Sequence, residues 1–171
     1  AATTQRRIVD WSTGQKLAPG QILATQDQLK STASGYAIPI SAGTLQTWAR
    51  QINDGSQTTQ GFQDYAQQQA KLAFPTLAKQ IDSGLTVKQI ADPYAQIAAN
   101  TLGIDANTID WSDPKWSAAL QGSPAKPGAE PTGPMTHQQW QQALMSSPVY
   151  GYSHSTQGQT DAYNLVSPLK Q

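Results

Sequence analysis

The strongest constraint on the fold is the helical spacing of the apolar residues, which prolines and glycines interrupt at short intervals. Between residues 62 and 81, mostly apolar residues and one glutamine recur at spacings of about three or four, as on one face of an α-helix. This stripe consists of Phe62, Tyr65, Ala66, Gln69, Ala73, Leu77 and Ile81. Pro75 falls inside it and predicts a kink or break near Phe74, because proline lacks a backbone donor and clashes with the preceding turn. No run of β-branched residues alternates over more than a few positions, so strands are not expected.

Capping residues mark the ends of several predicted helices. Ser41 stands where an N-cap is expected, before an apolar stripe. The pairs Thr86/Gln89 and Thr136/Gln139 have the spacing of a capping box, in which each residue satisfies a free N–H group of the other. These signals predict helices that begin at about residues 42, 87 and 137.

Two Asp-Pro pairs predict further helix starts. Asp92-Pro93 and Asp113-Pro114 are each expected to supply an N-cap and the first residue of a fresh helix. Gly103 is a natural stop for the helix before the second pair. Together the patterns predict an all-α fold of about six to eight short helices with proline kinks, plus a C-terminal helical arm after a Pro/Gly linker.

The domain organisation follows from changes in composition along the chain. Residues 1–20 contain many turn formers, which predicts an irregular segment, and residues 21–120 carry the main set of helical stripes. Residues 121–135 contain four prolines and three glycines and are expected to form a linker. Residues 136–171 are then expected to form a separable helical arm, which the linker carries outward.

The arm has too small an apolar stripe to be stable by itself, because short helices gain most of their stability from packing. Its last helix, at about 156–166, is expected to turn Ala162, Leu165 and Val166 inward. We therefore expect the arm to dock, preferably on another molecule. The candidate interaction residues are Trp140, Leu144, Tyr150, Tyr152, Leu165 and Val166.

Charge and cysteine content exclude several classes of protein. The 171 residues include 11 basic and 11 acidic ones, and this balance offers no electrostatic attraction to nucleic acid or to an anionic membrane. Glutamine, with 24 residues, interleaves with apolar positions and predicts polar helix faces. The absence of cysteine excludes disulfides, thiolate metal sites and cysteine nucleophiles. No stretch approaches the roughly 20 apolar residues of a membrane span.

The side chains that could carry chemistry have simpler structural explanations. His137 and His154, with Asp161, do not match the spacing of a zinc site, and we expect polar surface instead. The only glutamate, Glu130, lies in the Pro/Gly segment, which is a poor support for a catalytic carboxylate. The sequence therefore predicts no catalytic residue, no metal ligand and no cofactor.

Two clusters remain open to a functional interpretation. Asp105, Asp110 and Asp113 could include a pair of glycosidase carboxylates, but turn and cap positions explain each of them. The tryptophans could stack on sugar rings, although packing in the core is the preferred interpretation. They are Trp11, Trp48, Trp111, Trp116 and Trp140.

Three stretches together resemble a region of virion structural proteins of tailed phages of actinobacteria. They are "GLTVKQIADPYAQIAANTLGIDANTIDWSDPKWSAALQG", a Pro/Gly loop, and "MTHQQWQQALMSSPVYGYSHSTQGQTDAYNLV". The upstream Trp helix and "F..Y....A...FP.L...I..G" helix fit the same order, so the resemblance covers roughly residues 38–166.

The resemblance implies a non-enzymatic virion component, either the tail tape-measure or tail-tip region or an internal protein ejected with the DNA. Its partners would be other virion proteins and further copies of itself. Three alternatives stay open: a peptidoglycan- or sugar-binding helical module associated with a wall-degrading protein, a wall-degrading enzyme, and an unrelated helical adaptor.

Overall fold

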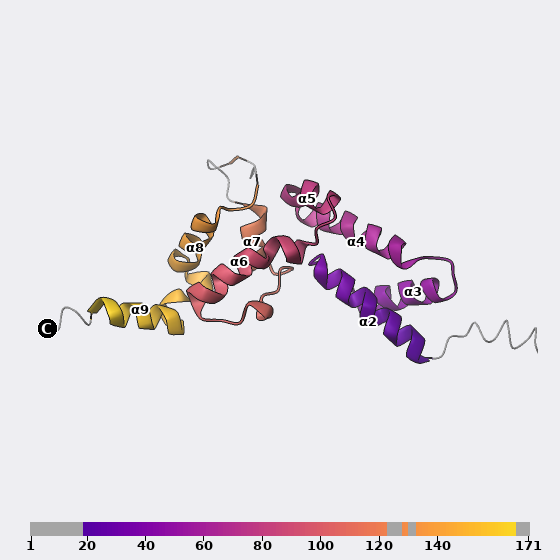
Figure 1. The fold of residues 1–171 in the computed structure, drawn as a ribbon, viewed down its shortest axis with the longest axis horizontal. Coiled ribbons are helices and arrows are strands. Elements are labelled where there is room, and N and C mark those ends of the chain that lie inside the picture. The colour runs from indigo at the N-terminus through magenta and orange to yellow at the C-terminus, as the bar shows by residue number, and fades with distance from the viewer. Residues whose placement is uncertain (1–18, 123–127, 130–132, 167–171) are drawn as a thin grey trace, which may run out of the picture. The chain divides into compact units, whose positions relative to one another are not determined.

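Every regular element of the described chain is a helix, and the all-α prediction is thereby confirmed (Figure 1). The computed structural model describes residues 19–122, 128–129 and 133–166. In these ranges there are eight α-helices and four short 3-10 helices. None of the described helices is both long and apolar enough to cross a membrane. The chain forms two compact units, Ala1–Gln69 and Ala70–Gln171, and is described unit by unit below.

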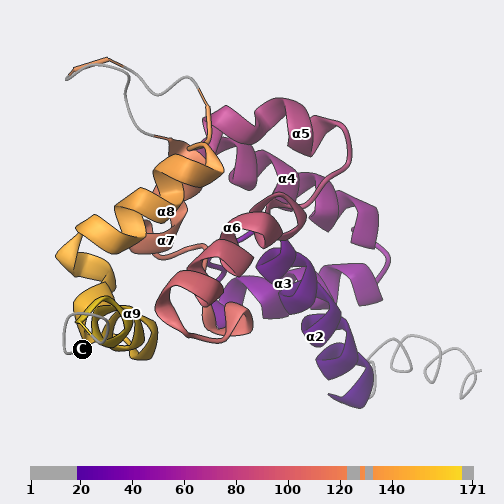
Figure 2. The same ribbon diagram turned by 60° about the vertical axis from the view of Figure 1, so that its left-hand side comes forward.

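The described part of the first unit consists of α2 (Pro19–Gly35), α3 (Ala42–Asn53) and most of α4 (Thr59–Ala73). Helices α2 and α3 lie side by side in both ribbon views (Figures 1 and 2). Ser41 caps α3 through a bond from the Thr44 N–H to its hydroxyl oxygen, as expected. The core of this unit contains Leu29, Ala33, Tyr36, Leu45, Ala49, Phe62 and Ala66.

Aromatic side chains connect α3 and α4 within the first unit. The half-buried ring of Trp48 lies 5.3 Å from the ring of Phe62 and 5.6 Å from that of Tyr65. The Gln67 amide donates a 3.1 Å hydrogen bond to the hydroxyl oxygen of Tyr36. Trp48 thus contributes to packing, as the sequence predicts, although part of its surface remains open.

The end of α2 is unusual because an alanine occupies a position that favours glycine. Ala37 has φ 54°, and its N–H bonds to the Ser34 carbonyl while the Ile38 N–H reaches the Ala33 carbonyl. These two bonds form a Schellman motif, in which glycine is preferred at the left-handed residue. Ala33 and Ile38 occupy the two positions whose apolar contact commonly accompanies the motif, and both are buried.

The break that Pro75 predicts lies near the start of the second unit. Helix α4 ends at Ala73, Phe74 leaves the helical region with φ −129° and ψ 70°, and η1 (Pro75–Leu77) and α5 (Ala78–Asp82) follow. The Lys71 ammonium lies 2.7 Å from the Asp82 carboxylate, across this turn. Since both side chains are substantially exposed, the pair adds little stability compared with the buried Phe74, Leu77 and Ile81.

The centre of the second unit is α6 (Val87–Leu102), which buries Val87, Ala91, Tyr94, Ala95, Ala98, Thr101 and Leu102. Its N-terminus has the expected capping box of Thr86 and Gln89. Gly103 ends it in the left-handed conformation with φ 68°.

The chain continues through η2 (Ala106–Thr108) into α7 (Pro114–Gln121), which Asp113 caps as predicted. After the Pro/Gly segment follow α8 (His137–Ser146), η3 (Pro148–Tyr150), η4 (Tyr152–His154) and α9 (Thr156–Val166). The capping box of Thr136 and Gln139 opens α8, and the helix stops before Pro148, both as predicted.

The predicted helix start at Asp92-Pro93 is wrong, because α6 continues through both residues. An interior proline removes a backbone hydrogen bond and crowds the carbonyl one turn back, at a cost of about 3 kcal/mol. Pro93 lies on the exposed side of α6, so water can reach the Gln89 carbonyl that loses its partner. Burial of Tyr94, Ala95 and Ala98 beyond the proline outweighs the local cost.

The two compact units divide the chain differently from the predicted domain boundaries. The two units meet inside α4, so the expected main domain of residues 21–120 is divided. Helix α8 of the expected arm, residues 136–171, packs on α6 within the second unit. The first residue of the expected linker 121–135 is the last residue of α7. Of the expected irregular segment 1–20, only Pro19 and Gly20 are described, and they form the start of α2.

Replacing Pro93 by alanine should stabilise the second unit. The new N–H can restore the bond to the Gln89 carbonyl. Alanine also leaves the unfolded chain more flexible than proline does, which offsets part of this effect. We expect the free energy of unfolding to rise by about 1–2 kcal/mol. Urea denaturation followed by far-ultraviolet circular dichroism measures the difference. Pro114→Ala is the matched control and should gain nothing, because at the first position of α7 no helical bond is missing. Equal stabilisation by both variants would contradict the explanation.

Candidate functional site

The six candidate interaction residues all lie in the second unit but have different environments. Trp140 and Leu144 on α8 are fully buried, and Tyr150 and Tyr152 are half-buried. Leu165 and Val166, at the end of α9, are 75% and 48% exposed. The prediction that Ala162, Leu165 and Val166 turn inward is therefore wrong.

Trp140 is the centre of an aromatic cluster, defined here as Tyr94, Trp116, Trp140 and Tyr150, to which Tyr94 contributes its backbone carbonyl. Its indole N–H donates a buried 3.0 Å hydrogen bond to the Tyr94 carbonyl on α6. Its ring lies edge-on to the rings of Tyr150, at 5.3 Å, and of Trp116, at 6.4 Å. Edge-to-face pairs of this kind are favourable, and the buried indole N–H has the partner that it needs. Segments that are far apart in the sequence thus meet at Trp140, and their helices α6 and α8 lie close together in the ribbon view (Figure 2).

Tyr150 closes the cluster against α7. Its hydroxyl donates a 2.8 Å hydrogen bond to the Lys115 carbonyl, and its ring lies 5.6 Å from that of Trp116. Burial, with a smaller contribution from the negative charge of Asp113, raises the pKa of the Tyr150 phenol above its usual value. The Lys115 ammonium lies over the Trp116 ring, 4.6 Å from its centre, in a cation–π contact.

Tyr94 fixes the place where the Pro/Gly segment returns to the unit. Its hydroxyl donates a 2.6 Å hydrogen bond to the Met135 carbonyl, and burial raises the pKa of this phenol. The Met135 N–H in turn donates to the Ala119 carbonyl of α7 at 2.8 Å. These bonds return the chain to α7 and α6 at the start of α8, which is why α8 does not project as a separate arm.

The first half of α9 is attached to η4. The Tyr152 hydroxyl donates to the Asp161 carboxylate at 2.6 Å, and the Gln157 amide donates to the other carboxylate oxygen at 2.8 Å. Gly158 is buried so tightly that an added Cβ would lie 2.0 Å from the Tyr152 carbonyl oxygen. Only glycine permits this close approach of the helix to η4.

The polar groups that suggested chemistry serve mainly as caps. The carboxylates of Asp105, Asp110 and Asp113 each accept a backbone N–H two residues ahead, at 2.9 Å. These bonds confirm the interpretation of the three aspartates as turn formers and helix caps.

The two histidines lie on exposed positions of the second unit. His137 is the first residue of α8, with its ring edge-on to Tyr94 at 5.3 Å, and His154 ends η4. Within the described ranges, no three metal-ligating side chains come together. Glu130 and Trp11 lie outside the described residues.

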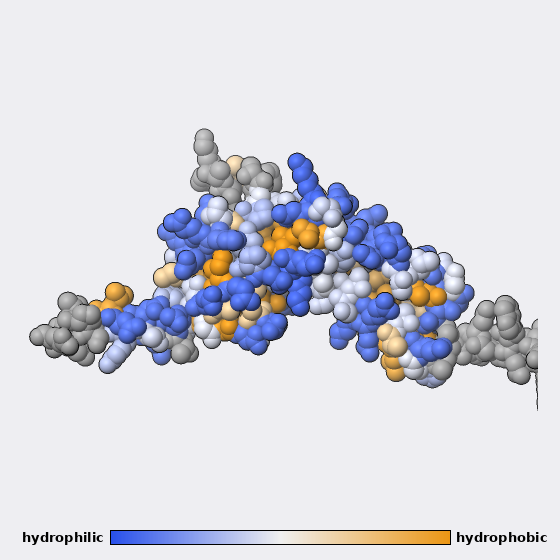
Figure 3. Space-filling view, viewed as in Figure 1, coloured by the Kyte–Doolittle hydropathy of each residue, from blue (hydrophilic) through white to orange (hydrophobic). Residues whose placement is uncertain are grey.

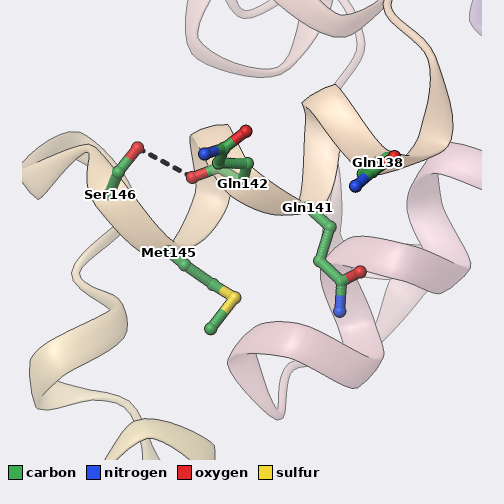
Figure 4. Close-up of a pocket in the computed structure, with 5 residues that line it drawn as sticks. All are labelled: Gln138, Gln141, Gln142, Met145 and Ser146. Atoms are coloured by element: carbon green, nitrogen blue, oxygen red, sulfur yellow. Dashed lines mark hydrogen bonds between the residues drawn. The ribbon is translucent and has the colours of Figure 1, made fainter.

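The outward side of α8 carries uncharged polar side chains. Gln138, Gln141, Gln142, Met145 and Ser146 line a depression of about 500 Å³ there (Figure 4). Ser146 donates a 2.7 Å hydrogen bond back to the Gln142 carbonyl, whereas Met145 is 47% exposed. The sequence predicts the polar glutamine face but does not single out Met145, because methionine at helical spacing also fits a core position.

No protein-family model, curated protein or solved structure matches the chain in the three comparisons.

Replacing Trp140 by phenylalanine should destabilise the second unit by about 1–3 kcal/mol, because the ring is shortened and the bond to the Tyr94 carbonyl is lost. Trp140→Ala should cost more, about 3–5 kcal/mol, since it also leaves a cavity. Urea denaturation followed by circular dichroism measures both. The control Gln141→Ala, on the exposed face of the same helix, should change stability by less than about 0.5 kcal/mol. Wild-type stability in Trp140→Phe would contradict the central role of this indole.

The raised pKa of Tyr150 predicts a loss of stability in alkali. The unfolded phenol ionises near pH 10, while the folded one holds its proton to higher pH. The stabilisation that the protonated Tyr150 phenol contributes is thus fully present below about pH 10. It is lost as pH rises through the pKa of this phenol in the folded protein. Tyr150→Phe should be less stable at neutral pH by about 0.5–1.5 kcal/mol but should lose stability less steeply above pH 10. Thermal melts across this range test it, with Tyr163→Phe, a 70% exposed ring, as the control.

Proposed function

We propose that the chain is a non-enzymatic structural component of a tailed-phage virion that works through protein–protein contacts. It would belong to the tape-measure or tail-tip region of the tail, or to an internal protein ejected with the DNA. Its partners would be other virion proteins and further copies of itself.

One observation carries the proposal: the residues of the phage-like pattern converge on the aromatic cluster. The "DPYA" motif supplies Tyr94, the "DPKW" motif supplies Lys115 and Trp116, and the tail motif supplies Trp140 and Tyr150. These residues come from distant segments and lie together in one packed part of the second unit. The pattern therefore coincides with a packed unit, which is compatible with a structural role.

The bonding of the cluster supports a structural role for it. The indole N–H of Trp140 and the hydroxyls of Tyr94 and Tyr150 all donate to backbone carbonyls of the same unit. Groups committed in this way hold helices together and are not free to bind or activate a substrate. The neutral charge of the chain also agrees with contacts that rest on shape and on apolar and amide groups.

The alternative of a peptidoglycan- or sugar-binding module has less support. Sugar stacking needs exposed aromatic faces, but Trp111, Trp116 and Trp140 are 7%, 8% and 0% exposed. Trp48 beside Tyr65 keeps a partly open ring and is the one described tryptophan to which this alternative could still apply.

The test is to locate the polypeptide in intact particles produced from the genome that encodes it. Particles are purified by density gradient, treated with protease and nuclease, and analysed by mass spectrometry before and after DNA ejection is triggered. We expect the chain to be present and protected inside the particles; its release on ejection would identify an ejected protein, and its retention in the tail a tape-measure or tip component. A chain absent from particles that instead sediments with purified peptidoglycan would overturn the proposal in favour of the alternative.

A further inference from the structure

Helix α9 lies against η4 and α6 without burying an apolar side chain of its own. Among residues 157–166, whose side chains the structure describes, Gly158 is the only buried residue, and Ala162, Leu165 and Val166 are exposed. Figure 3 shows hydrophobic atoms at the surface at the C-terminal end of α9. Helices in proteins gain most of their stability from the packing of an apolar face, and α9 receives little of this contribution.

Polar contacts attach the first half of α9 to η4. The Asp161 carboxylate accepts the hydroxyl of Tyr152 at 2.6 Å and the amide of Gln157 at 2.8 Å. Because Gln157 belongs to α9 itself, the Tyr152–Asp161 bond is the one of the two that joins the helix to η4. At the start of the helix, the Gly158 N–H donates to the Ser155 hydroxyl at 3.0 Å.

The helices beside α9 are held in a different way. Helix α8 fully buries Trp140 and Leu144, and α6 buries residues along its whole length. Opening of α6 or α8 would break the core, whereas opening of α9 breaks hydrogen bonds that lie near water. Segments with few buried apolar contacts open locally, at a free energy well below that of global unfolding.

We propose that α9 is a releasable helix, with the Tyr152–Asp161 hydrogen bond as its latch, which detaches and unfolds while α6, α7 and α8 stay folded. An isolated helix of 11 residues is marginal in water, so the released segment does not stay helical. These residues span roughly 16 Å as a helix and up to roughly 36 Å as extended chain. Release therefore about doubles the distance that this segment can bridge.

The first measurement is native-state hydrogen exchange of the full chain at low urea concentrations. The amides of residues 159–166 should exchange at least about a hundredfold faster than the buried ones of α8. Their rates should also be insensitive to urea, because release of α9 exposes little new surface, whereas exchange in α8 should accelerate with urea. Amides of α9 that share the rates and the urea dependence of α8 would show that α9 belongs to the core, and would overturn the proposal.

Two variants remove the latch from its two sides. Tyr152→Phe keeps the ring and the Gln157–Asp161 bond, and Asp161→Ala removes both bonds to the carboxylate. Each should accelerate exchange in α9 by about fivefold or more and leave exchange in α8 unchanged. Alanine forms helices better than aspartate does, so faster exchange in Asp161→Ala cannot come from a lower helix propensity. Unchanged exchange of α9 in both variants would rule out the latch.

Asp64→Ala is the matched control for the bond within the helix. Asp64 on α4 accepts the amide of Gln60, one turn earlier, at 2.9 Å, as Asp161 accepts that of Gln157. Pairs at this spacing contribute little, so exchange in α4 should change by no more than about twofold. Exchange in α9 should not change at all. A control effect on α4 as large as that of Asp161→Ala on α9 would mean that the bond to Tyr152 adds nothing.

Gly158→Ala should release α9 permanently. The added Cβ would lie 2.0 Å from the Tyr152 carbonyl oxygen, so the helix could no longer approach η4, although alanine favours helix over glycine. We expect the α9 amides to lose their protection and chymotrypsin to cut after Tyr163, while α8 keeps its slow exchange. If protection is lost from α6 and α8 as well, α9 is an integral part of the unit and the proposal is wrong.

Discussion

The buried hydrogen bond from the Trp140 indole to the Tyr94 carbonyl is the contact on which the second unit depends. An indole is too large to bury without several partners, and its N–H is too polar to bury without an acceptor. Trp140 meets both needs by drawing α6, α7, α8 and η3 around itself. Because the bond joins residues 46 positions apart, it also defines how α8 lies on α6. The bonds of Tyr94 and Tyr150 to backbone carbonyls then hold the intervening chain in place.

Much of the local structure follows from the sequence, because capping and helix termination act within about one turn. The capping boxes at Thr86 and Thr136, the stop at Gly103 and the break before Pro75 all depend on neighbouring residues. Pro93 has the same local signal as Pro114, yet only Pro114 begins a helix. The difference lies in what the following turns bury, and a four-residue pattern contains no information about that.

The candidate site was less predictable for a related reason. The spacing of Trp140 and Leu144 shows that they share a face but not whether this chain or another molecule covers it. The structure buries both within the chain, and it leaves Leu165 and Val166 uncovered although the same periodic signal predicts them to be inward. Periodicity identifies the apolar face of a helix. How many turns of that face are covered depends on how far the neighbouring helices extend along it. Tyr94 and Trp116 could not be paired with Trp140 from sequence, because nothing local connects their three segments.

The bond between the Met135 N–H and the Ala119 carbonyl has a consequence for how this kind of unit can change over time. It makes the position of α8 independent of the number of residues between α7 and α8, since both ends of that segment are attached to the body. Lengthening a closed loop is inexpensive, about 0.6 kcal/mol for each doubling. Insertions and deletions should therefore accumulate between Gly122 and Pro134 while the packing around Trp140 stays the same. That interval is also the natural place to graft a reporter peptide without disturbing the helices.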